Sequence, residues 1–210
     1  MPKNLIRRGR AAAAIAAAVS AVALTAAPAN AVVLDIEYDV TGTSTIASTG
    51  SEVALGPALL TIAAESEGGP VTGTLPLPGT RTQFKLAGFI PVSADVSFEV
   101  AEPLTGTITR VGRQRTIATT SSYYLKLSNV KAVGLPLFAG PWCRTKEPIT
   151  INASSPAGEY FAIGSGGHLT GEFSIGKFQN CGLNTLLINS IIPGDGNTVD
   201  LQIANGRTIG

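Results

Sequence analysis

The sequence predicts an all-β fold, an antiparallel β-sandwich or β-barrel of about ten strands with one short helix near residues 183–192. The 210-residue chain holds 24 Gly and 13 Pro and only 14% charged residues, a composition typical of many short strands joined by turns. Several segments alternate apolar and polar residues, the pattern of half-buried strands. No linker long enough to separate two domains interrupts them, so they should form a single sandwich or barrel.

The alternation is clearest in four segments. In VVLDIEYDV (32–40) Leu34, Ile36, Tyr38 and Val40 face one way and Asp35, Glu37 and Asp39 the other. VSADVSFEV (92–100), LTGEFSI (169–175) and TVDLQI (198–203) show the same period of two. Weaker strands are expected at 52–63, 81–87, 104–110, 115–119, 122–133 and 148–153.

The helix is expected in LNTLLINSII, where the apolar residues change period. Leu183, Leu186, Leu187 and Ile191 fall at helical spacing, and Pro193 ends the run.

A short motif also repeats along the chain. The segments at 70–77, 103–110 and 168–175 share Val/Leu-Thr-Gly followed by a further residue and an apolar one. A glycine inside a strand often marks a bulge or a bend. The repeat indicates either a weak internal duplication or chance matches in a Thr- and Gly-rich chain.

Residues 1–31 are predicted to be a secretory signal peptide. A basic start with Lys3, Arg7, Arg8 and Arg10 precedes an uncharged, Ala-rich apolar run and the small residues Ala-Asn-Ala at 29–31. The run is too short and too weakly apolar to span a bilayer well. We therefore expect cleavage after Ala31 and a single exported domain over 32–210, secreted or held non-covalently at the cell envelope.

Removing residues 1–31, which hold four of the 15 Lys and Arg, leaves 179 residues with 11 Lys and Arg against 14 Asp and Glu, a formal net charge of −3. A mildly acidic protein has no global attraction to nucleic acid or to anionic membranes. No second long apolar run follows, so we expect no nucleic-acid partner and no transmembrane segment.

The two cysteines, Cys143 and Cys181, are predicted to form a disulfide because exported chains meet oxidising conditions. The alternative, a catalytic thiol, needs a base, and nothing in the sequence ties the single histidine to either cysteine. Trp142 is expected to pack on the bridge. The disulfide should hold the helix against the sheet, so the stability of the chain from Leu183 onward should depend on it most.

Four short motifs lie in the second half of the chain: Gly-Leu-Pro (134–136), Cys-x-Thr (143–145), Phe-x-x-Cys-Gly (178–182) and Pro-Gly-x-Gly-Asn (193–197). With these motifs the chain resembles the C-terminal half of a group of secreted, β-rich actinobacterial proteins, and the resemblance covers much of the chain after residue 31. The resemblance implies export, a disulfide and a β-fold, and it supplies no catalytic residue, cofactor or activity.

Three other patterns could carry chemistry. Ser165 and His168 in IGSGGH resemble the surroundings of a serine nucleophile, but a strand follows where a nucleophile elbow needs a helix, so a Gly-rich turn is favoured.

The row Asp35, Glu37 and Asp39, with alternate residues about 7 Å apart, could serve a glycosidase, although a solvated face is the simpler interpretation. Asp195, Asn197 and Asp200 offer oxygen ligands for calcium without the spacing of an EF-hand.

A fourth pattern is basic. Arg110, Arg113 and Arg115 surround an expected hairpin tip and could form an anion-binding loop for an envelope polymer or a lipid headgroup.

The sequence therefore predicts no catalytic residue, no metal site and no cofactor. The favoured function is that of an exported, non-enzymatic β-domain with a binding or structural role in the envelope or outside the cell. A β-barrel carrier of an apolar ligand such as a lipid and a carboxylate-dependent glycan hydrolase are the alternatives.

Overall fold

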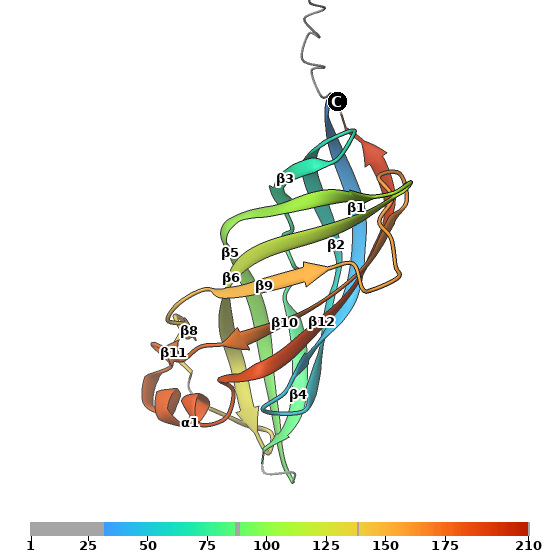
Figure 1. Cartoon of the computed structure of the whole chain (residues 1–210). Helices are drawn as coiled ribbons and strands as arrows, with labels where there is room; N and C mark the ends of the chain where they lie inside the picture. Colours follow the sequence, from blue (N-terminus) through green and yellow to red (C-terminus); the bar gives the residue numbers. More distant parts are fainter. Residues whose placement is uncertain (1–31, 87–88, 138, 210) are drawn as a thin grey trace, which may run out of the picture. The chain divides into compact units, whose positions relative to one another are not determined.

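A computed structural model of the chain describes residues 32–86, 89–137 and 139–209, which belong to one compact unit (Figure 1). The signal peptide expected at 1–31 lies outside the described residues. The strands are β1 (Val33–Ile46), β2 (Ser51–Glu65), β3 (Gly69–Thr74), β4 (Thr80–Leu86), β5 (Ile90–Val111), β6 (Gln114–Ala132), β7 (Leu135–Pro136), β8 (Arg144–Thr145), β9 (Ile149–Ser154), β10 (Gly166–Ile175), β11 (Phe178–Gln179) and β12 (Gly194–Thr208). A 3₁₀ turn, η1 (Gly182–Asn184), and a short helix, α1 (Thr185–Asn189), precede β12.

The predicted all-β class is confirmed, and the strand pairing closes on itself. The antiparallel order is β6-β9-β10-β12-β1-β2-β3-β5, and β5 pairs back with β6, which makes a ring of eight strands. The remaining short strands extend its edges: β4 pairs with β5, β7 and β8 pair with β6, and β11 pairs with β8. Of the two architectures expected, sandwich or barrel, this connectivity is that of a barrel.

Two long strands replace four expected ones. β5 spans the segments predicted at 92–100 and 104–110, and β6 spans those at 115–119 and 122–133. β5 stays paired with β6 on both sides of the register shifts between Val100 and Thr105, although the alternation of side chains is interrupted there. A β-bulge interrupts the period of two without ending the strand, so the sequence alone suggested a break.

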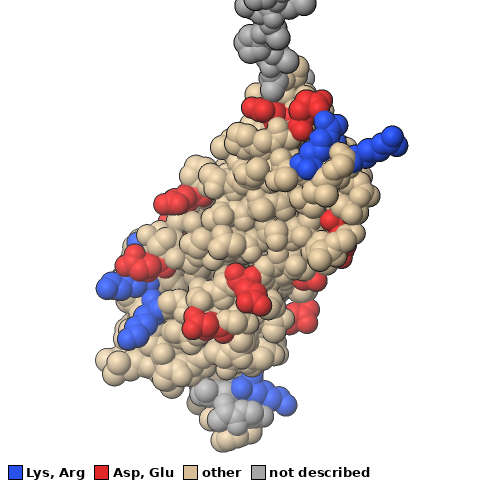
Figure 2. Space-filling model, in the orientation of Figure 1, with Lys and Arg blue, Asp and Glu red and all other residues tan. Residues whose placement is uncertain are grey.

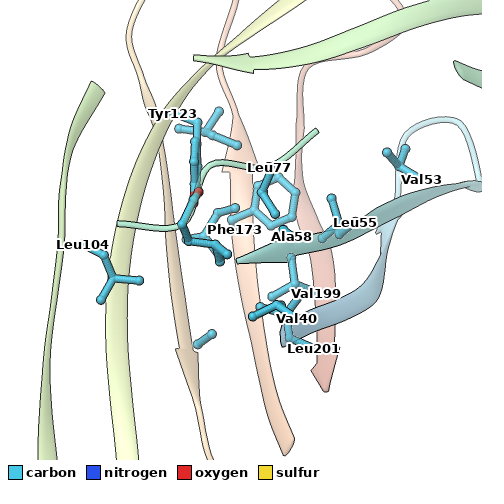
Figure 3. Close-up of a cluster of buried hydrophobic side chains, with 14 of the residues drawn as sticks. Val40, Val53, Leu55, Ala58, Leu77, Leu104, Tyr123, Phe173, Val199 and Leu201 are labelled. Carbon is cyan, nitrogen blue, oxygen red and sulfur yellow. The ribbon is translucent and has the colours of Figure 1, made fainter. Parts of the chain in front are cut away.

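The alternation predicted for β1 is confirmed. Ile36, Tyr38 and Val40 are buried, whereas Asp35, Glu37 and Asp39 lie on the outer face. Inward-facing apolar side chains from the other ring strands meet them inside the ring, as Figure 3 shows for Leu55, Leu104, Val199 and Leu201 among others.

Two buried tyrosines form hydrogen bonds from the core to backbone carbonyls of connecting segments. The hydroxyl of Tyr38 donates to the carbonyl of Ile163 at 2.7 Å, and that of Tyr123 donates to the carbonyl of Leu75 at 2.8 Å. Burial raises the pKa of each phenol to about 12. Both hydroxyls therefore stay protonated and act as hydrogen-bond donors.

The repeated Thr-Gly motif has a common geometry, and the structure adds a fourth copy in β1. A Cβ atom at Gly42, Gly73, Gly106 or Gly171 would collide with a backbone carbonyl of the adjacent strand, namely that of Asp200, Thr61, Ala118 or Asn152 respectively. These four contacts join β1 to β12, β3 to β2, β5 to β6 and β10 to β9. Each ring strand takes part in one of these four contacts, which need a glycine because it lacks a Cβ atom.

Candidate binding surface beside the disulfide

The predicted disulfide is confirmed. Cys143 and Cys181 are bonded, with 4.3 Å between their Cα atoms, and both are fully buried. The bond joins the segment that leads into β8 to the start of η1. It therefore fixes two surface segments that are 38 residues apart in the chain.

Four basic side chains lie on the solvent face of the edge formed by β6, β8 and β11. Lys126 lies opposite Arg144, and the backbone N–H of Lys146 donates to the carbonyl of Lys177 at 2.8 Å. Thr145 and Phe178 are buried. Arg144 points to the face opposite the buried Thr145 on β8, and Lys146 and Lys177, which lie just outside β8 and β11, are exposed.

Trp142 borders a groove on this face. Its side chain is 70% exposed, rather than packed away on the bridge as the sequence suggested. The groove has a volume of about 270 Å³ and is lined by Glu99, Lys126, Trp142, Arg144 and Asn180.

The Arg144 guanidinium lies 4.3 Å above the ring centroid of Tyr124, a cation–π contact that orients it. Glu99 approaches Arg144 at 3.8 Å and Lys126 at 4.0 Å. At these separations the ion pairs are weak. Both cations therefore remain available to an anionic ligand in the groove.

The helix predicted near 183–192 exists but is shorter, and its leucines face the solvent. Leu183 is fully exposed, Leu186 is 86% exposed and Leu187 is 41% exposed, whereas Ile188 is buried. In Figure 1 the helix lies on the outside of the sheet beside β11, and the corresponding surface in Figure 2 is uncharged.

Asn189 fixes this orientation. Its side-chain amide accepts from the N–H of Phe178 at 2.6 Å and donates to the carbonyl of the same residue at 2.9 Å. Helical spacing of leucines normally indicates a buried face, and no pattern in the sequence showed that Ile188 and Asn189 would face inward instead. We refer to Lys126, Trp142, Arg144, Lys146, Lys177, Leu183, Leu186 and Leu187 as the disulfide face.

The arginines predicted to form an anion-binding loop lie at the β5–β6 hairpin, as expected. Arg110 forms an ion pair with Glu67 at 2.9 Å, and Arg115 donates to the carbonyl of Ser66 at 3.1 Å. Arg113 is exposed in the turn. Because two of the three guanidinium groups already have protein partners, this hairpin is a weaker candidate than the disulfide face.

The carboxylate row on β1 is held by a neighbouring strand. Arg207 contacts Glu37 at 2.7 Å and Asp39 at 3.0 Å, and Asn205 donates to Asp39 at 2.8 Å. The hydrogen bonds from Asn205 and Arg207 lower the pKa of Asp39. A general acid needs a raised pKa, so the lowered pKa of Asp39 does not favour that role for it.

Two of the three possible calcium ligands, Asn197 and Asp200, have other partners, and the third, Asp195, is exposed. The Asn197 side chain is buried, accepts from the N–H of Ala47 and donates to the carbonyls of Phe173 and Gly194. Asp200 contacts His168. Among the described residues there is no group of three or more His, Cys, Asp or Glu that could hold a metal ion.

His168 lies between two carboxylates rather than beside a nucleophile. Its Nδ1 is 2.9 Å from Glu159 and its Nε2 is 3.1 Å from Asp200. Ser165 is exposed in the tight turn before β10. Both ring nitrogens are engaged by carboxylates, so the imidazole is arranged as a cation between two anions.

This arrangement predicts a pH-dependent contribution to stability. Burial lowers the pKa of His168, but the hydrogen bonds and charges of Glu159 and Asp200 outweigh it and raise the pKa above 6.5. A raised pKa stabilises the fold fully below the unfolded-state value and ceases to do so as pH rises through the folded-state value. His168→Gln should therefore cost about 1 kcal/mol at pH 5.5 and less at pH 9, measured by urea unfolding.

NMR titration of this single histidine provides the control. The midpoint in the wild type should lie above 6.5, and in Glu159→Gln with Asp200→Asn it should fall toward that value. A wild-type midpoint at or below 6.5 would contradict the ion-pair arrangement.

The interior of the ring contains small spaces. Two of them, among the described core side chains, measure about 60 Å³ and about 20 Å³. The larger is lined mostly by apolar side chains, among them Ile46, Phe84, Phe98, Phe173 and Ile192. Pockets that bind drug-sized ligands measure roughly 300–1,000 Å³, so these spaces do not favour a carrier that encloses a whole lipid.

Comparisons with protein-family models, with curated proteins and with solved structures found no match. In the part of the chain that the structure describes, no helix is long and apolar enough to cross a membrane.

Proposed function

We propose that this chain is an exported, non-enzymatic binding domain that uses the groove and the basic side chains of the disulfide face to bind an anionic ligand of the cell envelope. The observation that carries the proposal is the groove bordered by the exposed Trp142, with Lys126 and Arg144 in its lining. The exposed Lys146 and Lys177 add two further positive charges next to β8 and β11.

The geometry suits anion recognition. A guanidinium presents a planar fork of donors that matches phosphate and carboxylate groups, and Tyr124 holds the Arg144 fork in place before a ligand arrives. The buried disulfide and the pairing of β8 with β6 fix the two sides of the groove. Such preorganisation reduces the entropy lost on binding.

The intrinsic fluorescence of Trp142 provides a direct test because it is the only tryptophan in the chain. Titration with a short inorganic polyphosphate should change its emission. Lys126→Gln with Arg144→Gln should weaken binding by about tenfold or more, since a charge-assisted contact contributes roughly 1.5–3 kcal/mol.

The matched control removes two positive charges elsewhere, through Arg81→Gln with Lys85→Gln on β4, and should leave the affinity within about twofold. The proposal fails if the wild type does not respond to polyphosphate, or if both double variants lose binding equally.

A further inference from the structure

The disulfide face exposes more apolar surface than a soluble domain normally does. Leu183 and Leu186 are 101% and 86% exposed, and Trp142 is 70% exposed. Single exposed apolar residues are ordinary, but a group of them rimmed by polar residues marks an interaction site. Here the disulfide and the groove shared by Trp142 and Asn180 bring the tryptophan and the leucine segment to one part of the surface.

The leucines are presented by a fixed segment. Residues 182–189 carry no charge. The segment is held at one end by Cys181 and at the other by Ile188 and Asn189, whose side chains are turned toward the protein. The exposed leucines therefore do not reach the core, and burial in another apolar medium is the route by which they can leave water.

Positive charge lies beside this apolar segment. Lys126, Arg144, Lys146 and Lys177 account for four of the 11 basic residues after residue 31, whereas Glu99 lines the groove and Glu147 follows Lys146 in the chain. Although the net charge of residues 32–210 is negative, this part of the surface is locally positive. Apolar anchors combined with a basic patch bind anionic bilayers more firmly than either feature alone.

We infer that the ligand of the disulfide face is the surface of an anionic lipid bilayer. Leu183, Leu186 and Leu187 enter the boundary between headgroups and acyl chains, and Trp142 lies at the headgroup level, which indole rings favour. The lysines and Arg144 contact lipid phosphates. The inference rests on the proposed function and names its ligand.

A soluble anionic polymer, as the ligand, would account for fewer of the exposed side chains of the disulfide face. It would use the basic side chains and the groove, but Leu183 and Leu186 would stay in water. The two sources of phosphate therefore differ in what they require: binding to a bilayer depends on the leucines, and binding to a polymer does not.

Vesicle cosedimentation tests this difference. The full mature protein should bind vesicles of phosphatidylcholine containing about 30% phosphatidylglycerol, with weaker binding as salt is raised, and should bind pure phosphatidylcholine far less. Leu183→Ser with Leu186→Ser should reduce binding to the anionic vesicles by about tenfold or more, while binding to polyphosphate stays unchanged. The matched control, Leu59→Ser with Val111→Ser, changes two exposed apolar residues on other strands and should retain vesicle binding.

The outcomes separate the two proposals. If polyphosphate binds but the anionic vesicles do not, the bilayer is not the ligand and the proposed anion-binding function stands. If the leucine variant binds the vesicles as the wild type does, the leucines do not enter the bilayer and the inference is wrong, whereas the proposed function stands. If neither polyphosphate nor vesicles bind, both proposals are wrong.

Discussion

Replacing Cys143 and Cys181 together with serine should lower the free energy of unfolding by about 4 kcal/mol, the value that the chain-entropy model gives for a closed loop of this length. The loop spans 38 residues and both cysteines are fully buried. Urea unfolding of the wild type and of the double variant, both under non-reducing conditions, measures the difference.

The structure also shows which segments should become less stable when the disulfide is absent. The sequence suggested that the whole chain from Leu183 onward would open first. However, β12 pairs with β10 on one side and with β1 on the other along much of its length. Hydrogen exchange in the double variant should therefore increase in 139–146 and 177–192 but not in β12. Uniform protection from hydrogen exchange and an unchanged melting temperature would show that the disulfide does not stabilise these segments.

Gly171→Ala should destabilise the protein by about 3 kcal/mol or more, at the upper end of the range for overpacked sites. The new methyl group would collide with the Asn152 carbonyl and lie 3.0 Å from the Cα of Ala153, so backbone atoms, rather than a flexible side chain, would have to move. The strands β9 and β10 would have to separate to accommodate it. Thermal and urea unfolding provide the measurement.

Gly176→Ala is the matched control, because no atom lies within 4 Å of the position that its new methyl group would take. It should change stability by less than about 0.5 kcal/mol. Equal effects of the two substitutions would show that general loss of glycine flexibility, rather than close strand contact, is responsible.

Local patterns predicted much of this fold. The period of two in 32–40 identified both the buried and the exposed side of β1, and the export argument identified the disulfide partners. Closure of the ring could not be predicted, because it depends on β5 pairing with both β3 and β6. Nothing in the order of residues within β5 reveals that second partner.

The candidate site was predicted much less well than the fold. The sequence directed attention to Arg110, Arg113 and Arg115, which are close together in the chain, whereas the basic residues of the disulfide face come from three different strands or their flanks. The leucines at 183–187 were seen as a helical pattern, but their exposure depends on Asn189 binding the backbone of Phe178. Such tertiary contacts override local periodicity.

The Thr-Gly contacts also bear on how the protein could be redesigned. Each of the four glycines lets two strand backbones approach closely because it has no side chain. Taken together, the four contacts involve every strand of the ring. The close approach of strands at these four positions thus depends on main-chain geometry rather than on a side chain at the glycine. A designer could exchange inward-facing side chains for smaller ones to enlarge the 60 Å³ space, while leaving Gly42, Gly73, Gly106 and Gly171 untouched, and so convert a filled scaffold into a hollow receptor.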